Sequence, residues 1–187
     1  MTTMTATPRD SRQWTIDDLE QLPDDGRRYE LLDGKLLVSP APVVTHQLMV
    51  KALSSALDAV CPPELVVLFA PVDWQPDPRT SFQPDVLVVP NQNLGVKNIT
   101  EGMILDVEVL SPSTRDRDLV QKRAKYESSG VASYWVVDPD APSVLAWDLV
   151  DGRYRSAGVA SGDQTLALTL PFPVTLTPSA LLAPYNR

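Results

Sequence analysis

Three carboxylates lie inside or beside apolar segments that have the composition of β-strands. Glutamate is rare in this chain, with 6 residues against 18 aspartates, so a glutamate within such a segment stands out. Glu108 lies within the apolar segment 105–110, and Glu30 lies within the segment 29–32. Asp85 comes directly before a third apolar segment. These three acids are the first candidates for chemistry.

Carboxylates buried close together favour a metal ion. An unpaired buried carboxylate is energetically costly, and neighbouring carboxylates raise one another's pKa. A divalent cation removes that cost, and Mg²⁺ commonly takes one or two carboxylates together with water and substrate phosphate. Asp85 and Glu108 would be sufficient, and strand alternation places Asp106 on the same face as Glu108. The alternative is that each acid separately pairs with an arginine or caps a turn.

A basic segment follows Glu108 along the chain. Residues 115–125 have a local charge of +3, while the rest of the chain has a charge of −11. We expect a polyanion to dock there, through side chains that include Arg115, Arg117 and Arg123. The alternative is a solvated helix face.

Lys122 is the candidate cation for catalysis. A metal site that hydrolyses phosphodiesters also needs a positive charge that offsets the charge of the transition state. Lys122 begins the second turn of the helix predicted after Glu108. The alternative is that Lys122 forms an exposed i,i+4 pair with Asp118 on the helix surface.

Composition excludes several other classes of site. The single cysteine, Cys61, allows neither an intrachain disulfide nor a cysteine-based zinc cluster, so we expect a cytoplasmic protein. The single histidine, His46, excludes a two-histidine metal site and leaves one imidazole for a catalytic triad. No apolar stretch approaches the length of a membrane span, and the net charge of −8 repels nucleic acid and anionic membranes on average.

The elements that must position these residues follow from the apolar pattern. Helical spacing predicts helices over residues 15–21, 44–60 and 117–129, with a short turn of helix near Ser179. Turn dipeptides at Asp33-Gly34 and Asp151-Gly152 predict two hairpins. Continuous apolar runs predict strands that are covered on both faces, near residues 65–74, 82–89, 104–110 and 133–138, with a further one at 165–170.

This order predicts one mixed α/β domain over residues 14–187, preceded by a disordered lead over residues 1–13. The expected architecture is a central mixed β-sheet flanked by helices, with an N-terminal hairpin and a β-rich C-terminal tail. We expect the tail, over residues 143–170, to offer edges for a homodimer.

Four blocks of sequence in this order resemble the PD-(D/E)XK restriction-endonuclease-like superfamily. The blocks are YELLDGKLLVSPAPVVTHQ, PDVLVV, VEVLSPSTRDRD and GVASYWVVDP. Within that superfamily the chain is similar to a large bacterial family of "putative restriction endonucleases", formerly a domain of unknown function. The resemblance covers residues 14–183 and implies a restriction-endonuclease-like core.

The resemblance implies a role for each matching residue. Asp85 and Glu108 match the acidic metal ligands of the superfamily, with the carbonyl of Val109 as a further ligand and Mg²⁺ or Mn²⁺ as the ion. Glu30 matches an acid that reaches the metal through water. His46 matches a position that either orients a site group or caps its helix. The implied activity is a metal-dependent endonuclease that acts on DNA.

One position departs from the superfamily pattern. Leu110 stands where the pattern has lysine, two residues after Glu108. In the resembled family the lysine has moved to the next helix, where Lys122 matches, and Lys125 lies three residues farther on the same side. If the lysine has not moved, the implication is a catalytically inactive accessory or binding protein with the same fold.

Overall fold

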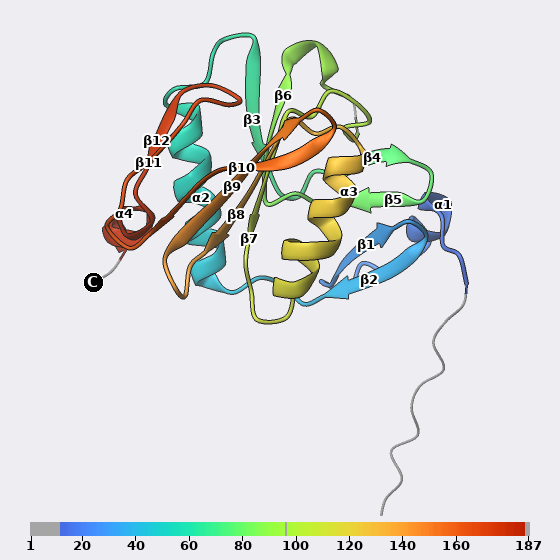
Figure 1. Ribbon diagram of the computed structural model, residues 1–187. Helices are drawn as coiled ribbons and strands as arrows, with labels where there is room; N and C mark the ends of the chain where they lie inside the picture. Colours follow the sequence, from blue (N-terminus) through green and yellow to red (C-terminus); the bar gives the residue numbers. More distant parts are fainter. Residues whose placement is uncertain (1–11, 96, 186–187) are drawn as a thin grey trace, which may run out of the picture.

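The computed structural model describes residues 12–95 and 97–185, so part of the expected lead, residues 1–11, lies outside it. A six-stranded mixed sheet forms the centre of the molecule (Figure 1), in the order β10-β9-β8-β7-β6-β3. Its parallel pair is β7 with β8, while its other neighbouring strands run antiparallel. The strands are β3 (Leu65–Phe69), β6 (Val86–Pro90), β7 (Leu105–Val109), β8 (Ser133–Asp138), β9 (Ser143–Val150) and β10 (Arg153–Ser161).

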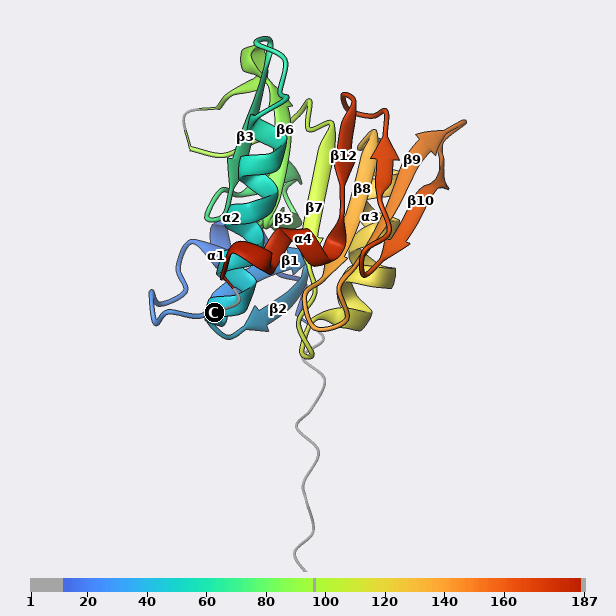
Figure 2. The same ribbon diagram turned by 90° about the vertical axis from the view of Figure 1, so that its left-hand side faces the viewer.

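Helices cover both faces of this sheet, which explains its continuous apolar strands. Helix α2 (Val44–Asp58) lies on one face, and the helix formed by η2 (Arg117–Lys122) and α3 (Arg123–Ser128) lies on the other, as Figures 1 and 2 show from two directions. Alternate residues of each strand therefore enter two separate cores. The predicted central mixed sheet with flanking helices is confirmed.

A smaller sheet packs beside the α3 face, in the order β2-β1-β5-β4. Its strands are β1 (Arg28–Leu32), β2 (Lys35–Ser39), β4 (Trp74–Asp77) and β5 (Thr80–Phe82). The predicted Asp33-Gly34 turn connects β1 and β2, and both of its residues have positive φ, as a type I′ turn requires. Helix α1 (Ile16–Leu19) precedes this sheet, and Thr15 caps its N-terminus by forming a capping box with Asp18.

Two predicted strands are each divided in the structure. The segment 65–74 separates into β3 and the start of β4, which belong to different sheets, and Pro71 lies in the connection. The segment 82–89 ends β5 at Phe82 and resumes as β6 at Val86, after Pro84. Because proline cannot donate to a strand ladder, it marks both breaks. The second break leaves Asp85 at the entry to β6.

The remaining elements complete the α2 face. Strands β11 (Leu166–Leu168) and β12 (Val174–Leu176) pair with each other, and α4 (Pro178–Leu182) packs against α2. Two short helical turns, η1 (Asn91–Asn93) and η3 (Ala183–Tyr185), lie outside the core. None of the helices in the described residues is long and apolar enough to cross a membrane.

Candidate functional site

A cavity of about 220 Å³ lies where the two sheets meet the helix that follows β7. Its walls come from β1, the end of β7, the first turn of α2 and η2. Two loops complete it, over residues 40–43 and 111–114. Four carboxylates line the cavity, and they belong to Glu30, Asp85, Glu108 and Asp118.

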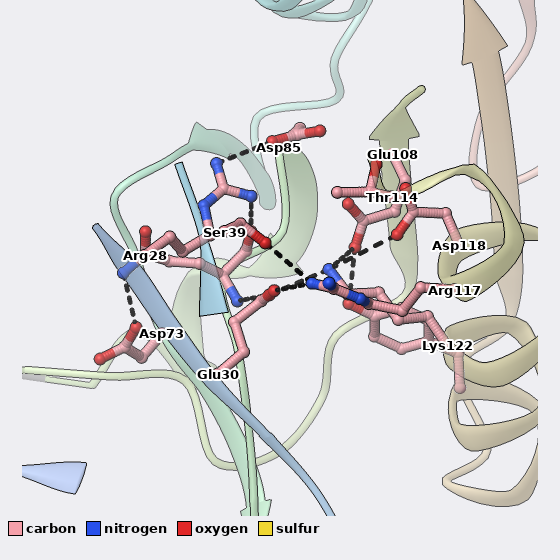
Figure 3. Close-up of polar contacts among 12 residues, drawn as sticks. Arg28, Glu30, Ser39, Asp73, Asp85, Glu108, Thr114, Arg117, Asp118 and Lys122 are labelled. Carbon is pink, nitrogen blue, oxygen red and sulfur yellow. Dashed lines mark hydrogen bonds and ion pairs between the residues drawn. The ribbon is translucent and has the colours of Figure 1, made fainter. Parts of the chain in front are cut away.

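Lys122 joins two of these carboxylates. Its Nζ donates to Glu108 Oε1 at 2.7 Å and to Glu30 Oε1 at 2.9 Å, as Figure 3 shows. The Lys122 side chain is only 2% exposed. The buried ammonium is therefore held between residues that are far apart in sequence, with β1 on one side and β7 on the other.

Lys122 reaches this position from a π-helix, η2, which has a wider turn than the α-helix expected from the sequence. Both Asp118 and Lys122 of this segment are buried, and Asp118 Oδ1 lies 4.0 Å from Lys122 Nζ. The predicted alternative, a solvated helix face carrying this i,i+4 pair, is wrong because the pair faces the cavity. Asp118 is thus a fourth acid of the site, and its four-residue spacing from Lys122 was the signal for it.

Asp85 is held from three directions. Its Oδ2 accepts from the backbone N–H of Val109 at 2.9 Å and lies 3.1 Å from His46 Nε2. Arg28 Nη2 donates to its Oδ1 at 3.1 Å. Arg28 is a residue that the sequence analysis did not single out, although strand alternation places it on the same face of β1 as Glu30.

Burial and charge divide the acids into two groups. Burial raises the pKa of Glu30 and Asp85, but nearby cationic and hydrogen-bonding groups outweigh it and keep both values below the ordinary range. Burial dominates for Glu108, whose pKa lies well above its usual value, and for Asp118, whose pKa is also raised. Burial lowers the pKa of Lys122, but the Glu108 and Glu30 carboxylates more than compensate and raise it. The ammonium therefore stays charged, while burial disfavours the charged forms of Glu108 and Asp118.

Asp106 lies next to this cluster on the same face of β7. It is fully buried, and neither of its oxygens has a hydrogen-bond partner among the described residues. Burial first, and then the like charges of Asp85 and Asp118, raise its pKa well above the usual value, against the opposing charge of Lys122. A fully buried carboxyl without a hydrogen-bond partner lowers the stability of the folded protein unless another interaction offsets that cost.

Two other predicted residues lie at the edge of the cavity. Arg117 donates to Ser39 Oγ at 2.8 Å and lies 3.6 Å from Glu30 Oε2. His46 lines the cavity and touches Asp85, while its Nδ1 is buried with no hydrogen-bond partner among the described residues. The structure thus gives His46 a contact with a site carboxylate.

The remaining predicted cations point elsewhere. Lys125 pairs with Asp33 and Asp77, and Arg115 pairs with Asp138 at 2.6 Å. Arg123 lies over the ring of Trp147. The structure thus groups Glu30, Asp85, Glu108, Val109, His46, Arg117 and Lys122 around the cavity, and it places Lys125, Arg115 and Arg123 outside its lining.

The donor set fits a metal site with two carboxylate ligands. No group of three acidic, histidine or cysteine residues in the described ranges could hold an ion together. Asp85 and Glu108 nevertheless both face the cavity, and the described hydrogen bonds to Glu108 use its Oε1 and leave Oε2 available. Val109 lies on the cavity wall as well. Mg²⁺ needs no more protein ligands than this.

Leu110 stands at the position where the resembled superfamily pattern has lysine. It is buried and packs in the same core as Tyr126 and Tyr134. A lysine at that position would bring its charge into an apolar core, so the ammonium of Lys122 is the one available to Glu108.

Comparison with known proteins agrees with this fold. The model of the Uma2 family, described as "Putative restriction endonuclease", matches residues 16–183. Among solved structures, one from Anabaena variabilis described as a "putative nuclease belonging to DUF820" is similar in fold, with a TM-score of 0.71 and 18% identity. The similarity covers 90% of this chain and 97% of that one. A search of curated proteins found no match. Because the family match extends over almost the whole chain, this protein belongs to the Uma2 family.

Proposed function

We propose that this protein is a metal-dependent DNA endonuclease of the PD-(D/E)XK type. Membership in a family described as "Putative restriction endonuclease" supports a nuclease. The observation that carries the finer proposal is the Lys122 ammonium, buried between Glu30 and Glu108 and facing a cavity that Asp85 also lines.

Asp85, Glu108 and the carbonyl of Val109 would hold the ion. In a strand, the N–H and C=O of one residue point to the same edge, and the Val109 N–H already points at Asp85. When bound, Mg²⁺ or Mn²⁺ supplies an activated water and polarises the phosphate. Arg28 and His46 fix the orientation of the Asp85 carboxylate through the contacts described above.

Lys122 would neutralise charge that grows on the scissile phosphate. A charged donor that is already positioned needs no reorganisation during the reaction, so it stabilises the transition state effectively. The carboxylates on either side keep Lys122 charged and hold it in place. Arg117, which contacts Glu30 and Ser39 of the cavity wall, would contact the same phosphate.

A specific observation favours a second candidate, a binding protein without catalysis. The chain carries a net charge of −8, and the cations that line the cavity are paired with acids. Such a protein would keep the fold and bind without cleaving.

Cleavage of plasmid and single-stranded DNA with Mg²⁺ or Mn²⁺ separates the two candidates. We expect cleavage that stops on addition of EDTA and that an Asp85→Ala variant lacks. Calorimetric titration with Mn²⁺ should show binding to the wild type and none to Asp85→Ala. A folded wild type that binds the ion but cleaves neither DNA would favour the binding protein.

A further inference from the structure

The proposed reacting groups are buried side chains that line a small cavity. Glu30, Asp85, Glu108 and Lys122 are each at most 2% exposed. The cavity volume of about 220 Å³ leaves room for one phosphate and parts of its neighbouring sugars. A scissile phosphate must therefore descend into the protein to reach them.

The loops beside this cavity carry no charge. The loop before α2 is Pro-Ala-Pro-Val, over residues 40–43, and the loop before η2 is Ser-Pro-Ser-Thr, over residues 111–114. Both lie at the lower end of the molecule in Figure 1. Neither loop can form an ion pair with the phosphates that flank the scissile one.

Most cations in the described part of the chain are already paired with acids. Near the cavity, Arg28 pairs with Asp85, and both Arg117 and Lys122 pair with Glu30. The described arginines and lysines that form no ion pair are on different elements, at Lys35, Lys51, Arg79, Arg123 and Arg155. The described surface thus has no continuous basic track for a long phosphate backbone.

These features disfavour an intact duplex. Proteins that hold duplex DNA rely on many phosphate contacts, each of which contributes to affinity by releasing counterions. A base-paired backbone is also held in a helix, so bringing one of its phosphates to buried side chains requires a costly distortion of the duplex. An unpaired strand rotates freely about its backbone and needs only the contacts inside the cavity.

We infer that the substrate is an unpaired DNA strand, either a single-stranded segment or an unpaired end, held through one or two phosphates. This inference rests on the proposed nuclease function.

The test compares one labelled strand in three forms, with the full-length protein and Mn²⁺. The strand is presented alone, annealed to its full complement, and annealed to a shorter complement that leaves an unpaired end. We expect cleavage of the free strand and of the unpaired end, with the paired region cut at least about 10-fold more slowly. Equal cleavage of the full duplex would overturn the inference and leave the nuclease function intact. If none of the three forms is cut, both the inference and the proposed nuclease function are overturned.

Salt dependence gives a second readout. With about two phosphate contacts on a single strand, the logarithm of kcat/KM should fall with the logarithm of salt concentration with a slope of about −1.4. A slope of about −5 or steeper would mean many phosphate contacts, and would contradict binding through one or two phosphates in the cavity. Arg117→Gln should reduce the slope by about 0.7, whereas Arg155→Gln, on the distant strand β10, should leave it unchanged.

Discussion

The two faces of strand β7 differ in chemistry, although the sheet packs an apolar core on each side. On the α2 face, Leu105 and Val107 of β7 pack against apolar residues of α2 such as Leu53. On the α3 face, β7 presents Asp106 and Glu108 beside Lys122. Both faces stabilise the fold by burying apolar surface, but the α3 face also buries charges, which oppose folding unless they are paired.

This difference indicates where selection for function has acted. A face that served only stability would carry apolar residues in place of Asp106, because a buried carboxyl without a partner destabilises a protein. We therefore expect substitutions on the two faces to change stability in opposite directions.

The largest change in stability is expected on the α2 face. Leu53 is fully buried at the centre of α2, and Leu53→Ala removes its packing and leaves a cavity. The free energy of unfolding should fall by about 2–5 kcal/mol, as urea denaturation would show. If the loss were below about 1 kcal/mol, the α2 face would not be the main source of stability.

A substitution at Asp106 is expected to raise the free energy of unfolding rather than lower it. Asp106→Val places a residue that suits a strand where a carboxyl now has no partner, so the free energy of unfolding should rise by about 1–3 kcal/mol at neutral pH. A variant less stable than the wild type would show that Asp106 has a stabilising partner.

The pH dependence of this gain checks its cause. The pKa of Asp106 is raised in the folded protein, so the folded state binds its proton more tightly than the unfolded state. The contribution of Asp106 to the free energy of unfolding of the wild type is therefore lost as pH rises above about 3.8, the ordinary pKa of an aspartate. The gain from Asp106→Val should be small near pH 4 and larger near pH 7. A gain that does not change with pH would indicate packing alone.

The smallest effect is expected at Lys125, whose ion pairs with Asp33 and Asp77 are partly exposed to solvent. Lys125→Met should lower the free energy of unfolding by less than about 1 kcal/mol, in a chemical denaturation experiment. Its cleavage rate should stay close to that of the wild type. If Lys125→Met lost cleavage, Lys125 would be the catalytic lysine.

Much of the fold and part of the site could be predicted from sequence. Apolar runs located the central strands because both faces are covered, and the Asp33-Gly34 turn located the first hairpin. Pro71 and Pro84 carried the information that two strands are divided, but the apolar residues on either side of each proline obscured it. Prediction was least accurate for boundaries between sheets.

The geometry of the site depends on features that a single sequence does not display. The π-helical turn leaves no pattern of residue types. The four-residue spacing indicated that Asp118 and Lys122 form a pair, but not that this pair is buried. The contact between Asp85 and the Val109 N–H uses the backbone, so any residue type except proline at position 109 would serve. The residue types therefore predicted the chemistry of the site better than they predicted how its side chains are arranged.

Lys122→Met is the sharpest test of whether Lys122 supplies the catalytic ammonium. Methionine retains much of the packing of the stem but leaves Glu30 and Glu108 without their cation, so some stability should be lost. Cleavage is therefore compared under conditions where circular dichroism shows the variant folded and calorimetry shows that it binds Mn²⁺. The account predicts a fall in cleavage rate of about 10²–10³-fold with Mn²⁺ binding retained. A folded, Mn²⁺-bound Lys122→Met protein that cleaves at the wild-type rate would contradict it.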